Sequence, residues 1–420
     1  ECRGILENGG IMAEEKLTSK QLLGELLQKH YAEAMEAKAQ GKPVVWSTSI
    51  APQELLEAMD LTVVYPENHA AAVASRKDAP QFIDKSEGDG YSADICSYAR
   101  VNIGYADLQH SEAQDIPMPD LIFCCSNICC TVIKWYENLA KKLNVPLIMM
   151  DAPFNSSYEV REDNINFLEA QLKDAIRQLE AFTGRKMDYD KLKDIMKTSN
   201  ETAKWWVEAT NMAMHNPSPL SGFDMFNYMA MIVCMRGKKD GARLFKLWYD
   251  ELKEKAEQGK GPWKDDSEEK YRILWDGIPC WHSLGPCYKI LKKNGINMVT
   301  STYPESWAIF YEPGDLHDMA RAYDAIYTQR NVEYAADRFI KLAGAFNVDG
   351  AIFHSNRSCK GMDFKQYEIQ RRLKEQLGIP SVMFDGDMAD PSAFSEAQYE
   401  TRVQALVEMM EERKARKGDK

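Results

Sequence analysis

The sequence contains no apolar run close to the roughly 20 residues that a membrane-spanning helix needs. It also lacks the charged and then apolar start of a secretory signal, so we expect a cytoplasmic protein. Its formal net charge is -12, and it lacks the basic excess that nucleic-acid binding requires. No G-x-G-x-x-G or G-x4-G-K-[ST] motif follows a predicted strand, which argues against a dinucleotide fingerprint and an ATP-binding phosphate loop.

Histidine is scarce, with 7 residues, whereas cysteine is plentiful, with 10. In a reducing compartment these cysteines indicate metal or redox chemistry in preference to disulfides. The 420 residues, of which 45% are hydrophobic, suffice for two or three domains with packed cores. Because Met12 has the character of a natural start, we expect residues 1–11, with Cys2, to be an upstream extension.

Strand-like and helical patterns alternate in two parts of the chain. Strands are predicted at 44–46, 61–65, 121–123, 145–150, 271–275, 296–300, 349–353 and 380–384. Helices are predicted at 17–40, 52–59, most of 160–259, 283–293, 315–345 and 397–413. We therefore predict an α/β protein with two parallel-sheet domains of Rossmann or flavodoxin type. The predicted boundaries are an N-terminal extension and helix at 1–43, a first domain at 44–159, a helical segment at 160–267 and a second domain at 268–420.

Four cysteines follow one of these predicted strands. In the segment PDLIFCCSNICCTVIKWYEN (119–138), a short apolar run precedes Cys124, Cys125, Cys129 and Cys130, and a helical pattern follows them. We expect the thiols on a strand-to-helix turn, at the sheet edge where α/β folds bind ligands. Free cysteine is often a buried hydrophobe, which we expect of Cys124 and Cys130. For Cys125 or Cys129 we expect a ligand role.

Other strand exits carry polar residues. WSTS (46–49) and YPEN (65–68) would bring Ser49 and Glu67 to the same sheet edge as the cysteine turn, if the sheet is parallel. Glu67 is either a surface carboxylate or a buried group able to polarise a hydroxyl. His354, at another exit, is expected to be a packed or hydrogen-bonded histidine.

Three thiolate candidates stand far apart in the sequence: Cys96, one of the 124–130 group, and Cys359. Their spacing does not match a zinc finger or the usual ferredoxin run. Converging thiolates suit an iron–sulfur cluster, and three ligands would leave one iron open. Arg100, about one helical turn after Cys96, makes a cofactor-facing surface plausible there. Arg357, beside Cys359, either hydrogen-bonds a cluster or substrate or satisfies its own loop.

Nine motifs occur together along the chain: WSTS (46–49), YPEN (65–68), ADICSYAR (93–100), PDLIFCCSNICC (119–130), KWYEN (134–138), GFDMFNYMA (222–230), GIPCW (277–281), HSNRSCK (354–360) and GDMADP (386–391). Together they resemble the 2-hydroxyacyl-CoA dehydratase family, which is related to the benzoyl-CoA reductases. The likeness is specifically to the larger catalytic subunit, and it extends over residues 21–413.

The resemblance implies an oxygen-sensitive [4Fe-4S] enzyme that dehydrates an (R)-2-hydroxyacyl-CoA to the (E)-2-enoyl-CoA through a ketyl radical. In the family three cysteines hold this cluster, and Cys96, Cys129 and Cys359 occupy the matching positions. Ser49 would lie near the open iron, and Glu67 near the substrate hydroxyl. The implied partners are a smaller related subunit, which forms a heterodimer with this one, and a separate ATP-hydrolysing iron–sulfur activator.

Two other functions remain open from the sequence. A benzoyl-CoA-reductase-like subunit would share the cluster and the activator but would reduce a ring; the WSTS and YPEN exits favour the dehydratase. A non-catalytic electron-transfer subunit would be expected to have four liganding cysteines and no open iron. The sequence leaves the identity of the acyl chain open.

Overall fold

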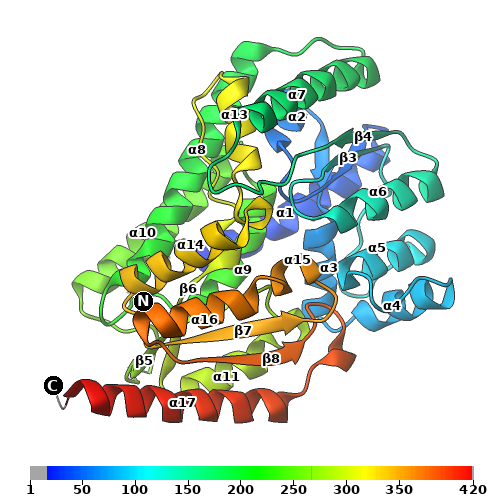
Figure 1. The fold of residues 1–420 in the computed structure, drawn as a ribbon. Helices are drawn as coiled ribbons and strands as arrows, with labels where there is room; N and C mark the ends of the chain where they lie inside the picture. The colour runs from blue at the N-terminus through cyan, green and yellow to red at the C-terminus, as the bar shows by residue number, and fades with distance from the viewer. Residues whose placement is uncertain (1–16, 266, 419–420) are drawn as a thin grey trace, which may run out of the picture.

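The structure, a computed structural model, describes residues 17–265 and 267–418. The expected start at Met12 lies outside these residues. Two four-stranded sheets, each with all neighbouring strands parallel, form the framework (Figure 1). This confirms the predicted α/β class with two parallel-sheet units. Within the described residues, none of the helices combines the length and apolarity needed to span a membrane.

The first sheet has the strand order β2-β1-β3-β4. Its strands are β1 (Val44–Ser47), β2 (Thr62–Val64), β3 (Leu121–Cys125) and β4 (Leu147–Met150). The accompanying helices are α1 (Ser19–Ala39), α2 (Gln53–Ala58), α3 (Pro66–Ser75), α4 (Ala79–Gly88), α5 (Ser97–Leu108) and α6 (Cys130–Leu143). The central strands β1 and β3 are buried along their whole length, as continuous apolar runs in parallel sheets are.

The second sheet repeats this order as β6-β5-β7-β8. Its strands are β5 (Tyr271–Asp276), β6 (Ile296–Ser301), β7 (Gly350–Asn356) and β8 (Ser381–Gly386). Its helices are α11 (Leu284–Lys293), α12 (Thr302–Glu305), α13 (Leu316–Asp324), α14 (Val332–Ala345), α15 (Lys360–Asp363), α16 (Gln366–Leu377) and α17 (Glu396–Gly418), and its 3-10 turns are η2 (Trp281–Ser283), η3 (Tyr327–Gln329) and η4 (Pro391–Ala393). The order is flavodoxin-like, with switch points between β1 and β3 and between β5 and β7.

A helical segment links the sheets. It contains α7 (Glu162–Thr183), α8 (Tyr189–Asn211), the turn η1 (Met212–Met214), α9 (Gly222–Cys234) and α10 (Lys239–Glu257). Helices α8 and α10 lie alongside one another, and α9 contacts both α1 and β6 (Figure 1). At the start of α9 a Cβ on Gly222 would lie 1.7 Å from the Met298 carbonyl oxygen, so this close approach to β6 requires glycine.

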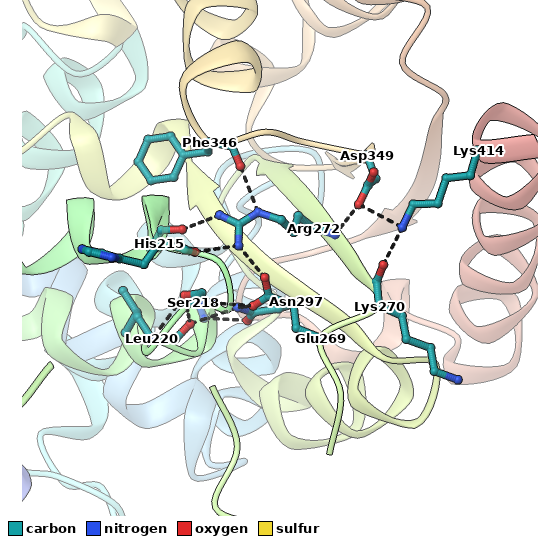
Figure 2. A network of polar contacts seen from close by, with 12 residues as sticks. His215, Ser218, Leu220, Glu269, Lys270, Arg272, Asn297, Phe346, Asp349 and Lys414 are labelled. Carbon is teal, nitrogen blue, oxygen red and sulfur yellow. Dashed lines mark hydrogen bonds and ion pairs between the residues drawn. The ribbon is translucent and has the colours of Figure 1, made fainter. Parts of the chain in front are cut away.

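Arg272, at the start of β5, fastens this segment to the second sheet (Figure 2). Its guanidinium pairs with Glu269 and donates to the carbonyls of His215 and Phe346, each at 3.0 Å. Glu269 in turn accepts from the side chain of Asn297 at 2.8 Å. Because both ions are almost fully buried, their pairing and hydrogen bonds must offset the cost of removing them from water.

Three predicted elements differ from the structure. Strand β3 continues through Cys124 and Cys125, because both pair with β4, so these thiols are not on the turn. Strand β7 continues through residues 354–356, which pair with β8, and its exit therefore begins at Arg357. The helix predicted at 315–345 is interrupted at 325–331. At the end of its first part, the side chains of Asn127 and Asn155 donate to the carbonyls of Tyr323 and Asp324.

Candidate active site

Ser49 and Glu67 meet at the carboxyl edge of the first sheet. Ser49 follows β1 and Glu67 lies in the first turn of α3, directly after β2, and these strands run parallel in register. The Ser49 hydroxyl donates to the Glu67 carboxylate, and the Ser49 amide lies 3.3 Å from each carboxylate oxygen. The Tyr136 hydroxyl, from α6, approaches the same carboxylate at 3.4 Å. The structure thus makes Glu67 a half-buried, hydrogen-bonded group, which is nearer to the buried than to the surface environment of its two expected ones.

Burial raises the pKa of Glu67 to about 7, although hydrogen bonds from Ser49 and Tyr136 oppose the rise. The carboxyl group therefore changes its protonation state near neutral pH. A group with this pKa can give or accept a proton under ordinary conditions. The Ser49 turn is itself held in place by Arg236, which is fully buried and donates to the carbonyls of Ser49 and Ala51, each at 3.2 Å.

The three predicted cluster ligands lie near one another. Cys96, Cys129 and Cys359 each occupy the position immediately before a helix, namely α5, α6 and α15. Burial raises the pKa of Cys96 and Cys359, and the charges of the other predicted ligands raise both further. A Cβ on Gly361 would lie 3.8 Å from the Cys129 Cβ, which places α15 against Cys129. The sheets thus bring together thiols that are more than 200 positions apart.

A hydrogen-bonded clamp joins two of these cysteine segments. The Ser97 amide donates to the Ser358 hydroxyl at 3.1 Å, and that hydroxyl donates to Asp387. Asp387 also accepts the amides of Ala389 and Asp390, each at 2.9 Å. This Ser358–Asp387 clamp therefore holds the loop before Cys359 against the start of α5, which follows Cys96.

In 17–265 and 267–418, no three His, Cys, Asp or Glu side chains converge on one metal-ion position. The chemistry of the three cysteine thiols fits an iron–sulfur cluster. The Ser97 hydroxyl and both side-chain polar atoms of Asn356 are buried without a partner among the described residues. Three facing thiols beside unpaired polar atoms match the soft ligands and hydrogen bonds that such clusters take.

A cavity of 180 Å³ adjoins the Ser49–Glu67 pair. Its lining comes mainly from α3 and α9, and it includes Ser49 and Glu67 from the first half of the chain. Its aromatic lining comes from Tyr98, Phe226, Trp281, Tyr303 and Trp307. A larger cavity of 590 Å³ between α8, α13 and α14 includes none of the predicted site residues. The smaller cavity is therefore the one that adjoins reactive groups.

Several residues take roles that the sequence did not indicate. Four of these residues acquire their roles only through contacts between distant segments, and the sequence therefore did not indicate them: Tyr98, Tyr303, Trp307 and Asp387. Burial raises the pKa of Tyr98 and Tyr303, and charges at Glu67 and Cys96 raise it further, so both tyrosines lie near the carboxylate and near one of the thiols. The motifs ADICSYAR and GDMADP contain Tyr98 and Asp387, and this was the available signal.

Other expectations at this edge are corrected. Cys130 is exposed on α6, not buried, whereas Cys124 is buried as expected. Cys125 is buried in β3, where burial raises its pKa to about 12 and its charged neighbours are Asp324 and Asp151, so it does not join the facing thiols. Arg100 does not form a cofactor-facing surface, because it is buried and pairs with Glu87 and Asp390.

Residues just before Cys359 form hydrogen bonds with other parts of the same chain. His354 is buried, its Nδ1 contacts the Ile278 carbonyl, and its Nε2 lies 3.3 Å from the Cys280 sulfur. This is the packed, hydrogen-bonded histidine expected from the sequence. The Arg357 amide donates to the Gly386 carbonyl at 3.0 Å, which continues the pairing of β7 with β8. Its side chain is exposed, and the role of that side chain stays a prediction.

Sequence comparison decides which family this arrangement belongs to. The family model for the 2-hydroxyglutaryl-CoA dehydratase D-component matches residues 48–410. The chain belongs to this family. It is 47% identical to the (R)-2-hydroxyisocaproyl-CoA dehydratase alpha subunit of Clostridioides difficile, over 95% of this chain and 98% of that protein. It is 45% identical to the (R)-phenyllactyl-CoA dehydratase alpha subunit of Clostridium sporogenes, over 93% and 95% respectively.

A more distant relative of this family is the (R)-2-hydroxyglutaryl-CoA dehydratase subunit alpha of Acidaminococcus fermentans, at 34% identity over 95% of this chain and 98% of that protein. These relatives are subunits of CoA-thioester dehydratases, which are hydro-lyases. The resemblance stated from the motifs is thereby confirmed at the level of the family and of the alpha subunit.

Proposed function

We propose that this chain is the larger subunit of a [4Fe-4S]-dependent dehydratase that converts an (R)-2-hydroxyacyl-CoA into the (E)-2-enoyl-CoA. The observation that carries the proposal is the cavity beside the Ser49–Glu67 pair, whose lining residues Tyr98 and Tyr303 lie within the electrostatic influence of both Glu67 and Cys96. Such an enzyme needs a proton donor beside a hydroxyl and a redox centre beside a thioester, and this arrangement offers candidates for both.

Cys96, Cys129 and Cys359 would hold the cluster and leave one iron without a protein ligand. When bound, the cluster would lend one electron to the thioester carbonyl and recover it when the product forms, so that the reaction is redox-neutral. The substrate, as a ketyl radical, would expel its 2-hydroxyl, and its C3 proton would then become acidic and leave, which balances the proton that the hydroxyl takes up to form water. The protein supplies binding and orientation for this chemistry.

Glu67 and Ser49 would act on the departing hydroxyl. A carboxyl group with a pKa of about 7 is protonated in a substantial fraction of molecules at neutral pH, so Glu67 can give its proton to the hydroxyl as it leaves as water. Ser49, which donates to Glu67, orients that carboxyl group. The aromatic side chains around the cavity exclude bulk water from the reacting atoms.

Further parts of the proposal concern the setting of the enzyme. The relatives are named as alpha subunits, which supports a partner subunit. We propose that the partner is smaller and related to this chain, that a separate ATP-hydrolysing iron–sulfur protein supplies the electron, and that the complex works in the cytoplasm.

Anaerobic iron analysis and EPR on the complex with its partner subunit test the proposal. The Cys129→Ala variant should lose the cluster of this chain, whereas Cys130→Ala, which alters the adjacent but exposed thiol, should keep it. Addition of 2-hydroxyacyl-CoA thioesters should perturb the EPR signal of the wild-type cluster. A cluster that survives Cys129→Ala, or one indifferent to every thioester, would contradict the catalytic assignment.

A further inference from the structure

The cavity that holds Glu67 is poor in charge. Of the residues that line it, only Glu67 and Arg76 are charged. Arg76 is exposed at the end of α3, and its guanidinium already donates to the Ala113 carbonyl. Glu67, by contrast, is half-buried, and its carboxyl group accepts hydrogen bonds from Ser49. Among the described residues, the cavity wall thus contains no buried cation.

Most of the rest of the wall is apolar or aromatic. Its uncharged polar residues are Ser49, Asn68, Ser75 and Asn227; Asn68 already donates to Tyr31, and Ser75 and Asn227 are exposed. Phe226, Ala230 and Val233 lie at i, i+4 and i+7 on α9 and line one side of the cavity. Trp281 and Trp307 contribute indole rings from the second half of the chain. Such a wall favours an apolar ligand group through burial of its surface.

Trp307 also offers one unused hydrogen-bond donor. It is 4% exposed, and its indole N–H has no partner among the described residues. An indole N–H can only donate, so it requires an acceptor such as a carbonyl oxygen. The thioester carbonyl, or an amide carbonyl of the CoA arm, would satisfy it. This unpaired donor points to an uncharged polar ligand group in the same cavity.

A substrate with a side-chain carboxylate would be disfavoured in this cavity. Its charge would lose its water, face Glu67 and find no buried cation to pair with. An unpaired ion in such a place is costly, whereas an alkyl or aryl group gains from the same burial. A cavity cannot bind both kinds of side chain well without a polar group dedicated to the charged one.

We infer that this enzyme selects 2-hydroxyacyl-CoA substrates whose side chain is neutral and apolar, aliphatic or aromatic, and discriminates against those that carry a second carboxylate. The selection comes from the α9 stripe of Phe226, Ala230 and Val233 and from a lining whose described residues include no buried cation, since the buried Arg236 is not part of it and donates to the carbonyls of Ser49 and Ala51. This inference rests on the proposed function, because it assumes that the cavity receives the acyl group.

Anaerobic calorimetry on the intact complex tests the inference. Three ligands are compared: an aliphatic 2-hydroxyacyl-CoA, a 2-hydroxyacyl-CoA with a terminal carboxylate on a chain of similar length, and free CoA. The aliphatic thioester should bind about 100-fold more tightly than the carboxylated one, as expected when an unpaired ion is buried. Equal or tighter binding of the carboxylated thioester would overturn the inference and leave the proposed function intact. If no thioester binds more tightly than free CoA, the proposed function itself fails.

A matched pair of variants locates the selection. Ala230→Arg places a cation on the α9 stripe. It should reduce the ratio of the affinity for the aliphatic thioester to that for the carboxylated thioester by at least about tenfold. Ala230→Leu adds apolar bulk without charge and should keep the preference for the apolar thioester. Circular dichroism shows that both variants are folded. An unchanged ratio in folded Ala230→Arg would contradict the role of this stripe, and the wild-type comparison remains decisive if Ala230→Arg does not fold.

Discussion

Glu67 shows how burial alone can prepare a residue for proton transfer. Its carboxyl group is removed from water and has no cation beside it, and its hydrogen bonds from Ser49 and Tyr136 only partly compensate. The resulting pKa near 7 is a property of position, because an exposed glutamate has a pKa of about 4.5. Both predictions at this scale follow from that shift.

The first prediction concerns stability against pH. Because the folded pKa of Glu67 is raised, its contribution is fully present below pH 4.5 and is lost as pH rises through about 7. As pH rises from 4.5 to above 7, the free energy of unfolding of the wild-type protein should therefore fall by up to about 3 kcal/mol more than that of the Glu67→Gln variant. Urea denaturation at a series of pH values measures the difference. Parallel curves for the two proteins would contradict the burial of a titrating Glu67.

The second prediction concerns Ser49. Its hydroxyl stabilises the charged form of Glu67, so Ser49→Ala should raise the pKa of Glu67 further and move the pH profile of kcat/KM toward higher pH. Loss of the oriented carboxyl group should also lower kcat about 100-fold. Ser47→Ala is the matched control, because the buried Ser47 hydroxyl bonds only the Thr48 carbonyl among the described residues. An equal effect in both variants would show that packing, not orientation of Glu67, is responsible.

At the scale of elements, the site is assembled from helix starts. Cys96, Cys129 and Cys359 each precede a helix, so backbone amides of the first turn approach each sulfur and favour its ionised form. The start of α5 accompanies the first sheet, and the start of α15 accompanies the second. The Ser358–Asp387 clamp connects these two helix starts through hydrogen bonds.

The third prediction tests that clamp. Ser358→Ala removes the hydroxyl that accepts from Ser97 and donates to Asp387, so the two cysteine segments should be held less firmly. Iron release to a chelator should become about tenfold faster, as for lost supports of metal ligands. Ser358→Thr, which keeps a hydroxyl, should restore retention, and Ser392→Ala, which removes an exposed hydroxyl on η4, should have no effect. Wild-type iron retention in Ser358→Ala would refute the clamp.

At the scale of the whole molecule, the cavity depends on how the helical segment is fixed between the sheets. Arg272 and Glu269 form the buried joint that binds the loop around His215 to β5 and to the end of α14. An ion pair in this position is sensitive to the loss of either partner, because the remaining charge is left buried and unpaired.

The fourth prediction follows from this joint. Glu269→Gln should lower the free energy of unfolding by about 3–5 kcal/mol. Glu375→Gln, which removes one partner of an exposed pair with Arg371, should lower it by less than about 1 kcal/mol. Thermal unfolding of both variants measures the contrast. Similar small losses would show that the buried pair is not a joint.

Much of the fold could be predicted because its determinants are local. Apolar runs such as 121–123 and 271–275 are long enough for a strand and too short for a helix, and both lie in observed strands. The ends of the strands and helices were less predictable. Pairing with β4 extends β3 through Cys125, and the side chains of Asn127 and Asn155 bind the carbonyls of Tyr323 and Asp324 where the predicted long helix stops.

The sequence by itself determined the residue types and their placement at strand exits, because a parallel sheet collects those exits on one edge whatever its details. It also determined the family, since the motifs sufficed for that. Only the tertiary structure decided which cysteines face one another, that Glu67 is half-buried beside Ser49, and that Trp281 and Trp307 close the cavity. The Ser49–Glu67 pair, 18 positions apart, depends on the pairing of β1 with β2. The approach of Cys359 to the other thiols and the closing of the cavity depend on contacts between segments more than 200 residues apart, and such contacts exist only once both sheets have formed.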